Sequence, residues 1–152
     1  MNEIERKFIV LKEKFKPTGK GIDMKQGYLS ADAEKVIRIR IADEKGFVTI
    51  KGKMKGITRP EFEYEIPKNE AEIMLKMCSN NLVEKIRHIE DYMGMTWEVD
   101  IFTKENTGLM IAEIELEHED QEFELPPWLG NEVTFDRRYY NSWLSKNPFT
   151  KW

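Results

Sequence analysis

Residues 3–10 read EIERKFIV, and charged side chains recur there at every second position. Glu3, Glu5 and Lys7 fall on one side of the chain, and mostly apolar side chains fall on the other. Because side chains in a β-strand point alternately to the two faces of a sheet, this spacing predicts a strand with one strongly charged face. Whether that face points to solvent or to an interior decides what kind of β-structure the chain forms.

The same alternation recurs along the rest of the chain. The stretches are MKQGYLS (24–30), KVIRIRI (35–41), FVTIKGK (47–53), EFEYEI (61–66), EKIRHI (84–89), WEVDIF (97–102) and AEIELE (112–117). Short turns such as residues 43–46 and 93–95 favour antiparallel neighbours. The sequence therefore predicts about eight strands and a mainly antiparallel α+β fold.

Two stretches have a helical pattern. In residues 67–78 (PKNEAEIMLKMC), Asn69 and Glu72 have the spacing of a capping box, and apolar residues follow. The buried stripe predicted for this helix is Ile73, Met74, Met77 and Cys78. A second helix is predicted to start at Asp136 and to bury Leu144, and residues 124–130 (ELPPWLG) before it are predicted as a proline loop.

Composition narrows the class of protein. The 152 residues are 40% hydrophobic and 34% charged, which predicts one soluble domain spanning residues 1–152. The net charge of −4 gives no reason to expect a nucleic acid as partner. The single cysteine, Cys78, excludes an internal disulfide. No apolar run is long enough to span a bilayer, so we expect a cytoplasmic protein without a membrane partner.

The charged strand faces are segregated by sign. The basic sets are Arg38/Arg40, Lys51/Lys53 and Lys85/Arg87, and the acidic sets are Glu61/Glu63/Glu65, Glu98/Asp100 and Glu113/Glu115/Glu117. Like charges on one strand face repel, so bound ions of opposite sign would stabilise such faces. Clustered carboxylates suit a divalent cation, and clustered Arg and Lys suit an anion with several charges. Alternation alone still allows these faces to point to solvent.

The order of motifs resembles that of a known family. EIERKF is similar to the N-terminal Glu-x-Glu-x-Lys signature of the CYTH superfamily, the triphosphate tunnel metalloenzymes. It is followed in order by QGYL, IRIR, TIKGK, RPEFEYEI, EKIRH, WEVDIF, AEIELE and EVTFDRRYYN, from Glu3 to about Leu144. The short chain and the QGYL and PPWLG elements look most like the small bacterial branch. The resemblance implies a closed eight-stranded tunnel barrel with a charged interior and a few flanking helices.

That resemblance also implies roles for individual residues. The implied substrate-binding cations are Lys7, Arg38, Arg40, Lys51, Arg87 and Arg138, and the implied metal-binding carboxylates are Glu3, Glu5, Glu61, Glu63, Asp100, Glu113 and Glu115. Lys53 is added to the substrate-binding set from its charge and its shared strand face with Lys51. A Tyr–Lys pair is thought to activate water in the resembling enzymes, and Tyr28 and Lys85 match it. Arg138 fits equally well a role in docking the last helix, and Glu98 is expected to be solvated.

The function implied by the resemblance is metal-dependent hydrolysis of inorganic tripolyphosphate to pyrophosphate and phosphate, with Mg²⁺ or Mn²⁺. Nucleoside or thiamine triphosphatase activity, adenylate cyclase activity and non-catalytic polyphosphate binding stay open as alternatives. The expected partner is a small polyanionic substrate, and a homodimer is compatible with the sequence. The face of Glu3, Glu5 and Lys7 is then predicted to point into the barrel, with Phe8 outside it beneath helices.

Overall fold

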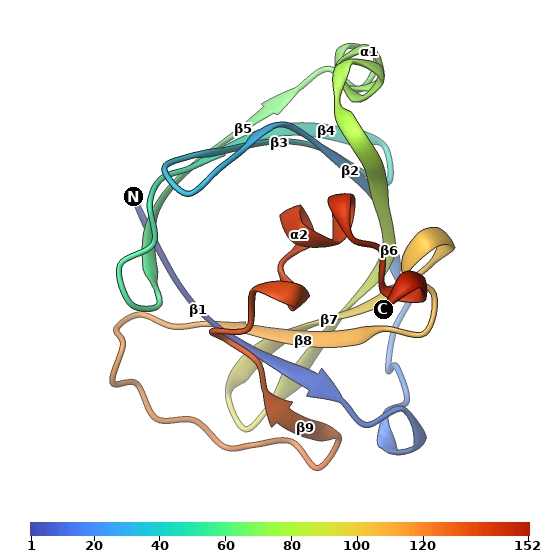
Figure 1. Ribbon diagram of the computed structural model, residues 1–152. Coiled ribbons are helices and arrows are strands. Elements are labelled where there is room, and N and C mark those ends of the chain that lie inside the picture. Colours follow the sequence, from blue (N-terminus) through green and yellow to red (C-terminus); the bar gives the residue numbers. More distant parts are fainter.

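Strands β1 to β8 form a closed antiparallel barrel in the computed structural model, which describes residues 1–152 (Figure 1). Their bounds are β1 Asn2–Val10, β2 Ile22–Ala31, β3 Val36–Ala42, β4 Lys45–Lys51, β5 Thr58–Ile66, β6 Ser79–Tyr92, β7 Met95–Phe102 and β8 Met110–Glu115. The order around the ring is β5, β4, β3, β2, β6, β7, β8 and β1, and β1 pairs with β5 to close it. The predicted eight-stranded barrel is confirmed.

Strand β1 closes the barrel because it has different partners along its length. Asn2–Ile4 pair with β5, Glu5–Ile9 pair with β8, and the end of β1 pairs with β9 (Leu129–Glu132). The prediction missed β9, which begins inside the stretch expected to be a loop. A four-residue strand that follows two prolines and contains Gly130 carries little alternation to detect.

The ends of the strands differ from those that alternation predicts. Strand β6 has 14 residues and extends well beyond residues 84–89 on both sides. Strand β4 ends at Lys51, and β8 ends at Glu115. Where a neighbouring strand is absent, the backbone hydrogen bonds of a ladder stop, whatever the side-chain pattern.

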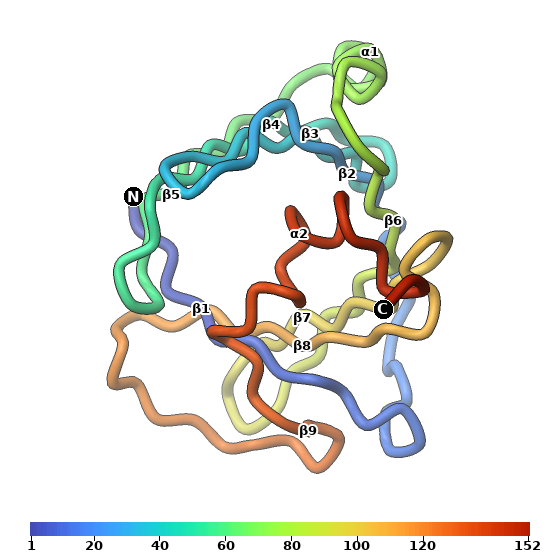
Figure 2. Tube along the Cα trace, in the orientation of Figure 1, coloured from blue at the N-terminus to red at the C-terminus, as the bar shows by residue number.

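The largest hydrophobic core lies on the outer face of β1, β7 and β8. Trp97 is fully buried there and packs edge-on against Phe8, Phe123 and Trp128, with ring centroids 5.6–5.9 Å apart. Phe123 and Trp128 belong to the segment between β8 and β9, which runs outside the ring (Figure 2). The prediction that Phe8 lies outside the barrel holds, but a long loop covers it where helices were expected.

Helix α1 (Lys68–Met77) covers the outer face of β3 and β4. Its buried residues are Ala71 and Leu75, whereas Ile73 and Met77 are 60% and 68% exposed. The buried face of the helix therefore differs from the predicted apolar stripe. The predicted cap at Asn69 was also wrong, because the helix starts after Pro67 and no side chain caps it.

The predicted second helix is divided into two parts. Asp136 caps a 3₁₀ turn over Arg137–Tyr139 by accepting a hydrogen bond from the Arg138 amide. The chain is extended at Tyr140, and α2 follows over Asn141–Lys146. None of the helices has the length and hydrophobicity that a membrane crossing requires.

Helix α2 lies within the ring of strands and closes one end of the barrel (Figure 1). The inward positions at this end are apolar, in contrast to the charged positions further along the same strands. Val83, Phe102 and Ile111 form a buried cluster there with Leu144 of α2. The C-terminal segment thereby replaces solvent at this end with a packed apolar plug.

Leu144→Ala should destabilise the protein by about 2–5 kcal/mol, because it leaves a cavity inside this plug. Urea denaturation measures the change in the free energy of unfolding. The matched control is Lys146→Ala on the exposed side of the same helix, with an expected change within about 0.5 kcal/mol. Equal effects of the two substitutions would show that α2 is not packed into the barrel.

Candidate functional site

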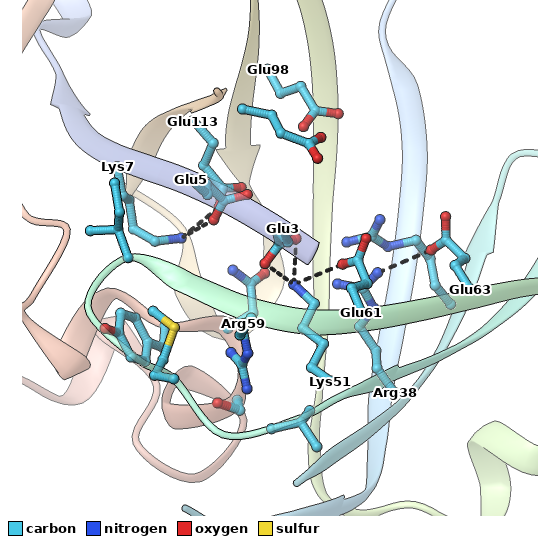
Figure 3. Close-up of a pocket in the computed structure, with 18 of the residues that line it drawn as sticks. Glu3, Glu5, Lys7, Arg38, Lys51, Arg59, Glu61, Glu63, Glu98 and Glu113 are labelled. Carbon is cyan, nitrogen blue, oxygen red and sulfur yellow. Dashed lines mark hydrogen bonds and ion pairs between the residues drawn. The ribbon is translucent and has the colours of Figure 1, made fainter. Parts of the chain in front are cut away.

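The inward-facing charges line a cavity of about 230 Å³ inside the barrel (Figure 3). Only 5 of its 22 lining residues are hydrophobic. The lining cations are Lys7, Arg38, Arg40, Lys51, Arg59, Lys85 and Arg87, and the lining carboxylates are Glu3, Glu5, Glu61, Glu63, Glu98, Glu113 and Glu115. Tyr28 lines the same cavity. The charged strand faces therefore point inward, as the resemblance implies.

Two predicted site residues lie away from this cavity. Lys53 lies beyond the end of β4, where alternation no longer fixes its direction, and its exposed side chain pairs with Glu34 at 3.5 Å. Arg138 pairs with Asp136 at 2.7 Å, and its guanidinium lies over the ring of Trp152. The structure thus gives no support for contact of either residue with a ligand in the cavity.

Asp100 is fully buried behind the cavity wall, where it pairs with two cations. Arg87 donates to both of its carboxylate oxygens at 2.8 and 2.9 Å, and the Lys85 ammonium lies 2.7 Å from Oδ2. Burial raises the pKa of Asp100, but Arg87 and Lys85 outweigh it and lower this pKa to about 2. With both oxygens engaged, Asp100 is placed to hold Arg87 and Lys85 rather than to bind a metal directly.

Arg87 neutralises a pair of carboxylates that face each other across two strands. Glu98 of β7 lies directly opposite Glu113 of β8, and like charges in this position repel. The Arg87 guanidinium donates to Glu98 at 2.8 Å and to Glu113 at 3.3 Å. Lys7 adds a second cation, 2.7 Å from Glu113. Glu98 is therefore part of the cavity wall, and the expectation that it is merely solvated was wrong.

A second cross-strand pair of carboxylates is only partly neutralised. Glu5 of β1 lies directly opposite Glu115 of β8. Lys7 is 3.9 Å from Glu5, whereas Glu115 forms no ion pair. Burial, followed by the nearby Glu113, raises the pKa of Glu5 well above its usual value, and burial followed by Glu3 raises the pKa of Glu115. Burial and neighbouring carboxylates therefore oppose the ionised form at both positions.

Arg38 and Arg40 of β3 are cations of the cavity wall that are incompletely paired. Arg40 donates from Nε to the side-chain carbonyl of Gln26 at 2.9 Å and forms no ion pair. Burial and the neighbouring Arg38 and Arg87 lower the pKa of Arg40 to about 9. Arg38 contacts Glu63 at 3.3 Å, but its Nε is buried without any hydrogen-bond partner. A buried donor without a partner is costly unless a ligand supplies the acceptor.

Lys85 is a buried cation that is already paired, because Asp100 lies 2.7 Å from its ammonium. Burial lowers its pKa to about 7, although Asp100 favours the charged form. Its remaining contact is a hydrogen bond to the side-chain carbonyl of Asn141 in α2 at 2.9 Å. The cavity thus contains a cation without an ion-pair partner, Arg40, and a carboxylate without one, Glu115, which suits an anion bound together with a cation.

The carboxylates can be tested against the ligand requirements of a divalent cation. No group of three or more His, Cys, Asp or Glu side chains is arranged to hold a metal ion by itself. Mg²⁺ usually binds proteins through one or two carboxylates and takes its other oxygens from water and substrate phosphates. The Glu5–Glu115 pair fits that pattern, with Glu3 beside it on β1, whereas a metal held by protein ligands alone does not fit.

Several cavity residues were missed by the sequence analysis. Arg59 shares its strand face with Glu61, and the pairing of Arg59 with Glu3 places it in the wall, so alternation could have found it. Tyr140 and Asn141 reach the cavity from the C-terminal segment. No local pattern in the sequence indicates that this segment enters the barrel.

The CYTH domain model matches residues 1–148 of the chain. This protein belongs to the CYTH family. It is 49% identical to an inorganic triphosphatase of Acetivibrio thermocellus, covering 97% of this chain and 95% of that one. It is 35% identical to an inorganic triphosphatase of Nitrosomonas europaea, covering 95% of this chain and 97% of that one.

Solved structures share the CYTH barrel. A crystal structure of an inorganic triphosphatase matches with a TM-score of 0.67 and 34% identity, over 94% of this chain and 93% of that one. A putative adenylate cyclase from Bacillus halodurans matches with a TM-score of 0.63 over 77% of this chain and 81% of that one. At 18% identity, the second likeness shows a shared fold only.

The pKa of Asp100 predicts part of the acid sensitivity of this CYTH protein. An aspartate whose folded pKa is about 2, against an ordinary 3.8, stabilises the fold above the ordinary value. This contribution, about 2 kcal/mol, is lost as the pH falls from about 4 to about 2. Urea denaturation across this range should therefore give a flatter pH dependence for Asp100→Asn than for the wild type.

The Asp100→Asn variant should also be less stable near neutral pH, because two buried cations lose their counter-ion. The matched control is Asp120→Asn at an exposed position, which should keep the slope of the wild type. Parallel curves for Asp100→Asn and the wild type would contradict the assignment of Asp100 as a buried counter-ion.

Proposed function

We propose that this protein hydrolyses inorganic tripolyphosphate to pyrophosphate and phosphate with a divalent cation, Mg²⁺ or Mn²⁺. The observation that carries the proposal is the charged cavity, in which Arg40 and Glu115 both lack an ion-pair partner, and Arg38 has a buried Nε without a hydrogen-bond partner. A polyphosphate complexed with a divalent cation presents the opposite charges to both walls. The inorganic triphosphatases that match nearly the whole chain support the same activity.

The size and lining of the cavity favour a small inorganic substrate. Its volume of about 230 Å³ is below the roughly 300–1,000 Å³ that drug-sized organic ligands usually occupy. Charged side chains dominate the lining, and its aromatic side chains are limited to Tyr28 and Tyr140. Nucleoside and thiamine triphosphates, with their organic groups, are therefore the less favoured substrates.

The proposed roles follow from the contacts of each side chain. Arg38 and Arg40 bind phosphate oxygens, because their guanidinium groups have donors to spare. The implied cations Lys7, Lys51 and Arg87 line the same lumen and add positive charge around the phosphate chain. Glu5 and Glu115 would hold the divalent cation, with Glu61, Glu63 and Glu113 nearby. Glu3 would join them if its carboxylate, whose two oxygens both accept from Lys51 at 3.0 Å, exchanged that partner for the cation. When bound, that cation supplies neutralisation of the developing phosphate charge.

Tyr28 and Lys85 remain the proposed residues that position the attacking water. Both side chains are buried and line the cavity, and Asp100 fixes the Lys85 ammonium. Phosphoryl transfer depends mainly on positioning and charge stabilisation, so two groups held this firmly suit the reaction. The predicted homodimer and cytoplasmic location stay predictions.

The wild-type protein should release phosphate from tripolyphosphate faster than from ATP or thiamine triphosphate, measured with Mg²⁺, with Mn²⁺ and with a chelator. Chelation should abolish the activity. Formation of cyclic nucleotide and pyrophosphate from ATP would favour a cyclase. Binding of tripolyphosphate without turnover would favour a polyphosphate-binding module, and either outcome would overturn the proposed function.

Glu115→Gln should raise the Mn²⁺ concentration needed for half-maximal activity by about tenfold, because it removes the charge of a cavity carboxylate that lies opposite Glu5 and has no ion-pair partner. The matched control is Glu98→Gln, which alters a cross-strand pair that Arg87 already neutralises. This control should change the Mn²⁺ requirement little. A similar rise in both variants would argue against a cation site at Glu5 and Glu115.

A further inference from the structure

Gln26 of β2 is a fully buried polar side chain that the proposed mechanism leaves without a role. It lies behind the cavity wall and touches three residues of the site. Its carbonyl accepts from Arg40 Nε at 2.9 Å, and its amide nitrogen donates to the Tyr28 hydroxyl at 2.9 Å and to the Asn141 carbonyl at 3.2 Å. Asn141 in turn accepts from Lys85 at 2.9 Å.

Arg40 and Lys85 fix the orientation of the side-chain amides of Gln26 and Asn141. An arginine guanidinium and a protonated lysine ammonium donate hydrogen bonds and never accept them, and Asp100, 2.7 Å from Lys85, favours the protonated form of this lysine. The atom of Gln26 that faces Arg40 must therefore be the oxygen, which leaves its NH₂ group for Tyr28 and Asn141. Lys85 likewise requires the oxygen of Asn141, and that same oxygen can accept from Gln26. Neither amide can flip without breaking a bond to a buried cation.

This orientation determines where the Tyr28 hydrogen points. A phenol has one hydrogen to donate, and its oxygen already accepts from Gln26. Tyr28 makes no other side-chain hydrogen bond in the protein, although it is only 5% exposed and lines the cavity. Its hydroxyl hydrogen is therefore directed away from Gln26 and is free for an acceptor in the cavity.

The backbone around Gln26 supports the same arrangement. The pairing of β2 with β6 shifts register between Gln26 and Tyr28, so both side chains are re-aimed at this point. Gly27 lies between them, and a Cβ atom there would come within 2.8 Å of the Leu82 side chain of β6 and within 2.9 Å of Cys78 at the end of α1. A glycine beside Gln26 thus permits the close approach of these neighbours.

We propose that Gln26 is a positioning residue of the triphosphatase reaction, which directs the Tyr28 hydroxyl hydrogen and the Arg40 guanidinium toward the substrate. Asn141 extends this positioning to Lys85 from the C-terminal segment. The inference rests on the proposed function for the identity of the substrate. The hydrogen-bond directions themselves do not depend on it.

The test is Gln26→Glu, which keeps an oxygen for Arg40 but replaces the NH₂ group with a second acceptor. The Tyr28 hydroxyl would then donate to this carboxylate instead of to the cavity. The expected result is a fall in kcat for tripolyphosphate of about tenfold to a hundredfold, with a much smaller change in KM. Gln26→Met, without the added charge, should lower kcat similarly and also raise KM, because Arg40 loses its acceptor.

A double-mutant cycle separates positioning from general disruption of the site. In the Tyr28→Phe background the target hydroxyl is absent, so Gln26→Glu should cost less than about threefold in kcat. Charge repulsion or loss of folding would persist in both backgrounds, so equal losses would overturn the proposal. Thermal unfolding of each variant identifies any that fail to fold, and the cycle is then run with Gln26→Met.

Equilibrium binding keeps this test separate from that of the proposed function. The same cycle is measured by calorimetry with inorganic tripolyphosphate and no metal. If the wild type binds but does not turn over, the proposed function fails, while weaker binding by Gln26→Met than by Gln26→Glu still supports positioning of Arg40. Equal Kd values for Gln26→Met and the wild type would then overturn it, as would a wild type that binds no tripolyphosphate.

Discussion

Charged side chains that point into a closed barrel must find partners inside it, because leaving a charge buried and unpaired is costly. Arg87 shows how the protein meets this requirement. One guanidinium on β6 binds Glu98 and Asp100 of β7 and Glu113 of β8, and thereby joins three strands through their inner faces. Where the protein's own charges balance, the wall is a structural ion-pair network. Where they do not, at Arg40 and at Glu115, the wall can bind a charged ligand.

Because the interior of the barrel is polar, the hydrophobic core lies mostly outside the ring of strands. Trp97 packs outside the barrel against a long loop, and α1 covers β3 and β4 through Ala71 and Leu75. Burial of apolar side chains therefore stabilises the barrel from without. Only at the end closed by Leu144 does an apolar cluster occupy the lumen. This arrangement leaves the middle of the barrel free for charged side chains without sacrificing a packed core.

The C-terminal segment links the stability of the fold to the chemistry of the site. Leu144 anchors it in the apolar plug, and Asn141, three residues earlier in the same helix, accepts from Lys85 and Gln26. Packing at one end of the barrel thereby holds polar groups in place in the middle. The buried Gln26 amide then connects Asn141 of this segment to Tyr28 of β2 and Arg40 of β3 through hydrogen bonds.

The sequence by itself determined the strands and which charged side chains share a strand face, because alternation is a local property of the extended backbone. The resemblance of its motifs to the CYTH family then implied that residues such as Glu5 and Arg38 line a cavity. Tertiary structure decided what depends on register and on strand ends. The opposition of Glu5 and Glu115, the position of Lys53 past the end of β4, and the entry of Asn141 into the barrel are all set by pairing and packing between distant segments. No local pattern contains that information.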